Sequence, residues 1–332
     1  MRKIIATNQS VQLKEVPKPE IKPNYILVRT VCSAISPGTE GTIINNSTGK
    51  EIPLGYSAMG RVEACGDGME GVREGDMVAC YGAPYVQHAE YMLVPKTLFA
   101  KVPDQVPVHE AAIAGLGAIA IHALRKASLQ FGETVVIAGL GVLGQLIARI
   151  ADAAAYQVIG YDIQAPRVEM VQEGTSIVAF SDKNEMEEEL KQRTNHYGAD
   201  AVLLCAGGKH SPLTSHGLEW VRDKGKVVIV GDIEPHFPRH LLFQKEAEIH
   251  ISRAGGPGRY DKVYEQQAID YPYGFIRWTE GRNIEAYIRL IENKRIDVSN
   301  LTKDGVDFES SPNAYKDLRE ERASMLTKMI YY

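Results

Sequence analysis

The sequence predicts an α/β protein with two domains, an antiparallel β barrel followed by a doubly wound parallel sheet. Three observations predict it. The length of 332 residues exceeds the roughly 100–200 residues that one domain usually holds. Residues 1–115 are rich in Gly and Pro and contain short β-branched runs. Residues 118–270 instead alternate apolar strands with amphipathic helices, which is typical of a parallel sheet covered on both faces.

The barrel-like part is predicted from four runs that are separated by turn signals such as GDG and EGD. These runs are YILVRTV (25–31), RVEAC (61–65), DMVACY (76–81) and AEYMLVP (89–95). Residues 270–332 return to mixed helix and strand pieces. We therefore expect a first domain made of residues 1–117 and completed by 270–332, with the parallel-sheet domain at 118–269.

The parallel sheet is predicted from six apolar segments, at 134–139, 157–162, 176–180, 199–207, 225–232 and 248–253. The helix after the first segment carries Leu143, Leu146, Ile147 and Ile150 on one face, as a helix packed on a sheet requires. Six such strands fit a doubly wound nucleotide-binding fold.

Composition excludes several classes of function. The formal net charge is −5 and no basic block stands out, so no nucleic-acid or anionic-membrane surface is expected. No apolar run approaches the ~20 residues that span a bilayer, and the start lacks the apolar core of a signal peptide. The four cysteines are scattered without a CxxC pair, which predicts reduced thiols. We expect a cytoplasmic protein that acts on a small molecule.

Residues 139–144 read GLGVLG, a GxGxxG motif between a predicted strand and the start of a helix. In that context the motif predicts a dinucleotide site. Gly139 makes the tight turn, Gly141 lets the backbone approach a pyrophosphate, and Gly144 lets helix and strand pack closely. Backbone N–H groups at the start of the helix, including those of Val142 and Leu143, hold the phosphates.

Four further positions, Asp162, Arg167, Gly207 and Asp232, are predicted to contact the cofactor. Asp162 ends the next predicted strand, where a carboxylate binds ribose hydroxyls and repels a 2′-phosphate, so NAD is favoured over NADP. The alternative for Asp162 is a turn residue or helix cap, and Arg167 nearby keeps NADP open. Gly207 and Asp232 follow the fourth and fifth predicted strands, at the sheet edge where a cofactor lies. The alternative for both is a simple turn.

With these motifs in this order, the chain resembles the medium-chain dehydrogenase/reductase superfamily, the zinc alcohol dehydrogenase-like group, over nearly its whole length. The resemblance rests on YILVRTVCSAISPGTE, PLGYSAMGRVEACGDGMEGVREGDMVAC, VQHAEYMLVP, AAIAGLGAIAIHAL and VVIAGLGVLGQLIARIA. It implies a GroES-like catalytic domain made from both chain ends, with a Rossmann domain between them. It also implies a homo-oligomer, a dimer or a tetramer.

The sequence departs from the superfamily where its metal-dependent members bind zinc. Their Cys-Gly-Thr-Asp-like stretch reads PGTE (37–40), their Gly-His-Glu reads GYS (55–57), and their later Gly-Cys-Gly reads GLG (115–117). A catalytic zinc needs three N, S or O ligands from the protein, so we expect no zinc. The chain thus resembles a zinc-less branch, which includes bacteriochlorophyllide-type dehydrogenases and bacterial two-part oxidoreductases thought to act on sugars or cyclitols.

Without a metal, side chains must handle the proton that leaves with the hydride. Tyr56 occupies the position of a ligand His, and its unperturbed pKa of ~10 must be lowered, for example by a nearby cation, before it can act as a base. The alternative for Tyr56 is a core or lid aromatic residue. Glu40 is a second catalytic candidate, with Thr39 beside it in the same loop. The alternative for Glu40 is a helix N-terminal carboxylate or a salt-bridge partner.

Substrate contacts are predicted mainly in the Arg- and Tyr-rich tract 252–283. Arg259 and Tyr260 are the candidates there, because Arg can bind vicinal hydroxyls or a phosphate. The alternative is a subunit interface, where Arg and Tyr are also enriched. His88 is a third candidate, for which a scaffold role near the cleft is the stronger alternative.

The leading hypothesis is a zinc-independent NAD(P)-dependent oxidoreductase that exchanges a hydride with a polyhydroxylated substrate, such as a sugar or a cyclitol. Three alternatives stay open. One is an enone or quinone reductase that uses NADPH. Another is an isomerase, epimerase or lyase that keeps and recycles its NAD. The last is a nucleotide-sensing protein without turnover.

Overall fold

A computed structural model describes residues 1–321 and 323–332. The chain divides into two compact units, unit 1 with residues 1–118 and 255–332, and unit 2 with residues 119–254. The sequence placed the second boundary at 269/270 instead. The structure assigns residues 255–269 to unit 1 because Tyr264 is buried in its core beside Val78 and Leu98. An Arg- and Tyr-rich segment gives no pattern that predicts such burial.

Unit 2 contains the predicted parallel sheet. Its described strands run in the order β11-β10-β9-β12-β13-β14, and every neighbouring pair is parallel. The strands are β9 (Thr134–Ala138), β10 (Gln157–Tyr161), β11 (Val178–Phe180), β12 (Ala199–Leu204), β13 (Val221–Ile229) and β14 (Glu248–Ile251). All five residues of β9 are buried, as expected for a central strand covered on both faces. The six predicted strands are confirmed.

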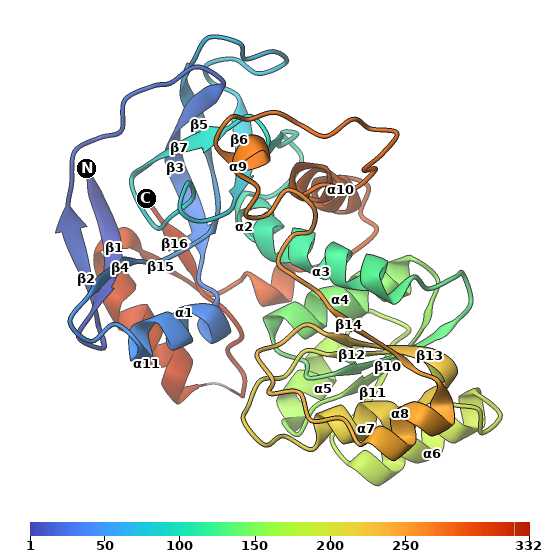
Figure 1. Cartoon of the computed structure of the whole chain (residues 1–332). Helices are drawn as coiled ribbons and strands as arrows, with labels where there is room; N and C mark the ends of the chain where they lie inside the picture. The colour runs from blue at the N-terminus through green and yellow to red at the C-terminus, as the bar shows by residue number, and fades with distance from the viewer. Residues whose placement is uncertain (322) are drawn as a thin grey trace. The chain divides into compact units, whose positions relative to one another are not determined.

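Helices flank this sheet on both sides. In Figure 1, α4 lies on one side and α6, α7 and α8 on the other. The helices are α4 (Val142–Ala153), α5 (Ala165–Gln172), α6 (Lys183–Arg193), α7 (Leu213–Trp220) and α8 (Arg239–Lys245). The core between sheet and helices includes Val136, Val202, Leu218 and Trp220. Helix α4 starts directly after β9, and the GxGxxG motif (139–144) forms the turn between them and the first residues of α4.

Unit 1 is built around a larger, mainly antiparallel sheet. Its described strands follow the order β15-β16-β3-β5-β6-β8, with β7 paired to β3. These strands are β3 (Tyr25–Ala34), β5 (Ser57–Cys65), β6 (Met77–Tyr81), β7 (Tyr91–Pro95), β8 (Phe99–Lys101), β15 (Gly305–Asp307) and β16 (Met329–Tyr331). Because β16 pairs with β3, the C-terminal strand completes the sheet of the N-terminal part, as the resemblance implies.

A second, smaller sheet in unit 1 has the order β2-β1-β4, from β1 (Arg2–Thr7), β2 (Ser10–Glu15) and β4 (Glu51–Pro53). Helices α1 (Pro37–Asn45) and α11 (Ser311–Glu320) accompany it. Their shared core includes Ile4, Ile35, Leu54 and Tyr315. This packing brings α1, near the start of the chain, against α11, near its end.

The remaining helices are α2 (Val108–Ala112), α3 (Ala114–Ala127), α9 (Lys262–Glu265) and α10 (Glu280–Glu292), with short 3₁₀ helices at Ser299–Leu301 and Phe308–Ser310. Helix α10 begins after Thr279, whose side chain caps it by accepting from Arg282 N–H. Among the residues that the structure describes, no helix combines the length and the apolar character that a membrane span requires.

Candidate active site

The GxGxxG turn in unit 2 has the backbone geometry that a dinucleotide site requires. Gly139 has a φ of +100°, a conformation that favours glycine. A Cβ on Gly144 would lie 1.9 Å from the Gly139 carbonyl oxygen, whereas a Cβ on Gly141 would meet nothing within 4 Å. Gly144 is therefore required for packing. Gly141, which is the N-cap residue of α4 without a side-chain cap, leaves the helix N-terminus open for close approach of an anion.

Asp162 joins this turn to the end of β10. Its carboxylate accepts hydrogen bonds from Leu140 N–H (2.7 Å), Gln164 N–H (2.9 Å) and Arg167 Nη1 (3.3 Å). Asp162 is buried, and its bond to Leu140 N–H stabilises the GxGxxG turn. Asp162 therefore lies at the expected site position and also has the alternative role of a turn residue. Its pairing with Arg167 means that both side chains lie at the same edge of the sheet.

Gly207 and Asp232 lie together just beyond β12 and β13. Gly208 N–H donates to the Asp232 carbonyl oxygen at 2.9 Å, and both Gly207 and Asp232 are exposed. The carboxyl edge of the sheet thus collects Gly139, Asp162, Gly207 and Asp232 on one side of unit 2. This is the edge at which doubly wound sheets bind their ligands.

Tyr56 is the centre of the candidate site in unit 1. It directly precedes β5, is half-buried and donates its hydroxyl hydrogen to Ser36 Oγ at 2.6 Å. Burial raises the pKa of Tyr56 to about 12, and the charge of Glu40 adds to this, while hydrogen bonds with Ser36 and Thr39 oppose it. The group near Tyr56 is thus a carboxylate and not the cation that would lower its pKa. Tyr56 is a hydrogen-bond donor at neutral pH.

Glu40 lies behind this hydroxyl cluster and is fully buried. Its Oε1 accepts from Ser36 N–H at 2.7 Å, and its Oε2 accepts from Tyr315 OH at 2.6 Å and lies 3.0 Å from His88 Nε2. Since both oxygens are occupied and closed to solvent, Glu40 is a positioning residue that ties the first turn of α1 to its surroundings. These contacts favour the alternative of a helix N-terminal carboxylate, and a role for Glu40 as a catalytic base stays a prediction.

His88 belongs to the same buried network and does not reach a surface. Its Nδ1 lies 2.7 Å from Ser33 Oγ, which in turn lies 3.1 Å from Tyr332 OH. With Nε2 on Glu40 and no exposed surface, the position of His88 favours the scaffold role, which was the stronger alternative. Contact of His88 with substrate stays a prediction.

Arg259 and Tyr260 follow a glycine-rich stretch in unit 1. Arg259 Nη1 donates to Glu265 Oε1 at 2.7 Å, and its guanidinium carbon lies 4.3 Å from the centre of the Tyr260 ring. Tyr260 is 58% exposed. The Arg259 side chain is only 11% exposed, so it is partly satisfied by the protein itself, whereas Tyr260 is open to contact.

Several residues of these hydrogen-bond networks were not predicted from the sequence. Ser36 is the partner of Tyr56, and Tyr315 and Tyr332 close the network around Glu40 and His88. Ser36 could have been found from its position just before the PGTE stretch. No local signal points to Tyr315, because it lies 275 residues from Glu40 along the chain.

Comparison with known proteins supports the resemblance described above. A family profile described as "Zinc-binding dehydrogenase" matches residues 139–268. An uncharacterized zinc-type alcohol dehydrogenase-like protein of Haemophilus influenzae is 27% identical, with 96% of this chain and 94% of that protein covered. The sorbitol dehydrogenase of Bacillus subtilis is 24% identical, with 99% and 96% covered. These matches confirm the resemblance of the chain to the medium-chain dehydrogenase/reductase superfamily.

A solved structure agrees with this assignment at the level of fold. The galactitol-1-phosphate dehydrogenase of Escherichia coli superposes with a TM-score of 0.79 at 18% identity, and the match covers all of both chains. The combination of a GroES-like unit and a Rossmann unit, expected from the resemblance to the medium-chain dehydrogenase/reductase superfamily, is thus confirmed.

The positions that hold zinc in metal-dependent members of the superfamily carry no metal ligand here. Pro37 opens α1, Tyr56 donates to Ser36, and Leu116 is a buried apolar side chain. Ser57, in the place of the Glu, donates to Ala112 O and accepts from Gly115 N–H. Within residues 1–321 and 323–332 no group of three His, Cys, Asp or Glu side chains is arranged to hold a metal ion. These residues do not fit a catalytic zinc.

Proposed function

We propose that the chain is a zinc-independent, NAD-dependent oxidoreductase that exchanges a hydride with a polyhydroxylated substrate. The observation that carries this proposal is Tyr56, a protonated hydroxyl at the position of a metal ligand, bonded to Ser36. The sorbitol dehydrogenase relative supports a polyol as the substrate class. The unit 2 turn with Gly141 and Asp162 supports NAD, because a carboxylate at the end of the second strand favours a ribose without a 2′-phosphate.

The residues proposed to bind NAD are the N–H groups at the start of α4 for the pyrophosphate and Asp162 for the ribose. The ribose hydroxyls would share carboxylate oxygens that already accept from Leu140, Gln164 and Arg167. The chemistry that NAD supplies when bound is acceptance of a hydride from the carbon that bears the reacting hydroxyl. Proton handling falls to the protein. The raised pKa of Tyr56 keeps the phenol protonated. Its one hydrogen can turn from Ser36 Oγ to the oxygen of a carbonyl substrate and be transferred to the strongly basic alkoxide that forms during reduction. Ser36 and Thr39 hold the phenol in place.

A substrate screen tests the proposal directly. Purified protein that has been treated with EDTA is expected to reduce NAD with at least one of sorbitol, xylitol or a cyclitol, at the rate of untreated protein. NADH is expected to bind at least tenfold more tightly than NADPH. Loss of activity with EDTA and its return with zinc would contradict the metal-free mechanism. Turnover of enones or quinones with NADPH alone would favour the reductase alternative instead.

The turn glycines offer a matched pair of variants for cofactor binding. Gly141→Ala is expected to weaken NADH binding roughly 30-fold with an unchanged melting temperature, because its Cβ meets no protein atom but blocks close approach of a pyrophosphate. Gly144→Ala is expected to destabilise unit 2 by about 3 kcal/mol, because its Cβ would collide with backbone. Fluorescence titration with NADH and thermal unfolding separate the two effects. Undiminished NADH binding by Gly141→Ala would contradict this site.

A further inference from the structure

Glu280, the first residue of α10, is a buried carboxyl group with no hydrogen-bond partner. The residue has no exposed surface, and neither Oε1 nor Oε2 has a partner among the described residues. Burial of a polar group without such a bond is costly. It is also rare enough in folded proteins to need an explanation. Neither the sequence motifs nor the mechanism above uses this carboxyl group.

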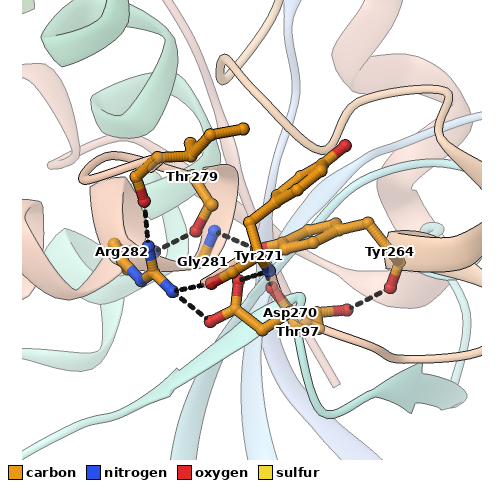
Figure 2. Close-up of polar contacts among 8 residues, drawn as sticks. Thr97, Tyr264, Asp270, Tyr271, Thr279, Gly281 and Arg282 are labelled. Atoms are coloured by element: carbon orange, nitrogen blue, oxygen red, sulfur yellow. Dashed lines mark hydrogen bonds and ion pairs between the residues drawn. The ribbon is translucent and has the colours of Figure 1, made fainter. Parts of the chain in front are cut away.

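The backbone that follows Glu280 is fixed by the network in Figure 2. Gly281 N–H donates to Tyr264 OH at 3.1 Å, and Tyr264 OH donates to the Thr97 carbonyl oxygen at 3.0 Å. Thr97 Oγ1 donates in turn to the Tyr264 carbonyl oxygen at 2.9 Å. Arg282, two residues on, is bonded to Asp270 and to the Tyr271 carbonyl oxygen. The backbone that carries Glu280 is therefore fixed, while its carboxyl group has no hydrogen-bond partner among the described residues.

The position of this carboxyl group is close to Tyr56. A Cβ on Gly255 would lie 2.6 Å from Tyr81 Cε1 and 3.3 Å from Glu280 Oε1. The side chains of Tyr81 and Glu280 therefore both lie against Gly255. The ring of Tyr81 packs edge-on against the ring of Tyr56, with 6.0 Å between centres. Glu280 thus lies one aromatic side chain away from the proposed proton donor, within unit 1.

The charges around Glu280 favour its neutral form. Burial raises the pKa of Glu280 to about 8; Arg259 opposes this, and Glu265 adds to it. Arg259 is already paired with Glu265, and the other titratable neighbours are the phenols of Tyr81, Tyr264 and Tyr271. A neutral carboxyl group both donates and accepts a hydrogen bond. Its chemical complement is an alcohol, which does the same.

Residues 256–260, which lie next to Glu280, include left-handed backbone conformations. Gly256 and Gly258 have φ values of +110° and +105°, and Tyr260 has a φ of +65°. A left-handed conformation at a residue with a side chain is strained and is found more often at ligand-binding sites. The same segment carries Arg259 and the exposed Tyr260. Glu280 N–H donates to the Pro257 carbonyl oxygen at 3.0 Å, so this segment lies next to Glu280. Because Glu280 is closed to solvent, a ligand can reach its carboxyl group only after neighbouring residues move.

We propose that Glu280 binds a second hydroxyl group of the polyhydroxylated substrate, beyond the one that is oxidised, and so selects polyols over monohydric alcohols. This inference rests on the proposed function. Residues 256–260 uncover the carboxyl group when substrate enters, and Arg259 lies beside it for a further oxygen. Glu280 is thereby a specificity-determining residue with no part in proton transfer.

Two substitutions of Glu280 and one control test this role. Glu280→Met is expected to raise the KM for sorbitol and xylitol 10- to 100-fold while the kcat/KM for 2-butanol changes less than threefold. Glu280→Gln, which still donates and accepts a hydrogen bond, is expected to keep KM within about fivefold of wild type. Glu285→Met, at an exposed position of the same helix, is the control and should change neither value.

Thermal unfolding distinguishes this role of Glu280 from a merely structural one. Glu280→Met removes an unpaired buried carboxyl group and should raise the melting temperature by a few degrees. The folded-state pKa of about 8 lies above the ordinary 4.5, so the folded protein holds the extra proton between these values. Wild-type stability should therefore fall as pH rises from 5 to 8, and Glu280→Gln should remove that fall.

The outcomes separate this inference from the proposed function. If wild-type protein oxidises polyols but Glu280→Met leaves their KM unchanged, the hydroxyl subsite is overturned and the proposed function stands. If Glu280→Met lowers the melting temperature, the carboxyl group has a structural partner and the subsite is likewise overturned. If wild-type protein oxidises none of the polyols, both proposals fail together.

Discussion

Tyr56→Phe is expected to lower kcat for carbonyl reduction about 100- to 1000-fold, the usual size of a general acid–base contribution. KM is expected to stay within about threefold, because the aromatic ring and its contact with Tyr81 are retained. The free energy of unfolding should fall by only about 1 kcal/mol, since one hydrogen bond to Ser36 is lost. Steady-state kinetics and chemical denaturation measure these effects.

The pH profile provides a second check on Tyr56. The phenol, with its pKa raised to about 12, is protonated throughout the accessible range. The rate of carbonyl reduction should therefore show no titration between about pH 7 and 10, whereas a His or a phenol of lowered pKa would produce a step there. Tyr197→Phe, at a tyrosine that is 78% exposed, is the matched control. A Tyr56→Phe enzyme with nearly full kcat would remove the residue from the mechanism.

Glu40→Ala is expected to destabilise unit 1 by about 3–5 kcal/mol, the typical cost of removing one partner of a buried charged network. The substitution leaves the Ser36 N–H, the Tyr315 hydroxyl and the His88 Nε2 without their acceptor in a site closed to solvent. Urea denaturation followed by circular dichroism would measure the change. Glu51→Ala is the control, because the ion pair of Glu51 with Lys14 is exposed and such pairs contribute only about 0–1 kcal/mol.

This prediction also separates the two roles considered for Glu40. A positioning residue loses stability on substitution, and kcat falls only as far as Tyr56 and Ser36 lose their geometry. A catalytic base would instead show a Glu40→Gln variant of near-normal stability whose kcat falls 100-fold or more, together with loss of the corresponding limb of the pH profile. That result would restore the original expectation.

The sequence predicted unit 2 better than unit 1 for a physical reason. Strands such as β9 and β12 are buried on both faces, so each is a continuous apolar run that can be read locally. The GxGxxG turn follows from the same locality, since Gly139 and Gly144 meet within six residues. The roles of Glu40 and His88 could not be read in this way, because their partners Tyr315 and Tyr332 come from the other end of the chain.

Segment 255–269 shows a different limit of sequence reasoning. Tyr264 is buried, yet its hydroxyl is satisfied by Thr97, so a tyrosine serves as a core residue without any apolar periodicity around it. Glu280 is similar, because nothing in the local sequence RWTEGR distinguishes a buried carboxylate from a solvated helix N-terminus. Its burial depends on residues 255–258, whose glycines allow close approach to Tyr81 and Tyr264.

The pairing of β3 with β16 sets the order in which the molecule can mature during synthesis. Residues 119–254 form a contiguous unit, so this unit can acquire its native sheet while later segments are still inside the ribosome. Strand β3 emerges early and must wait nearly 300 residues for β16. During that interval an edge of the N-terminal sheet stays unpaired and open to other chains. We therefore expect a chaperone to protect nascent unit 1 and not unit 2.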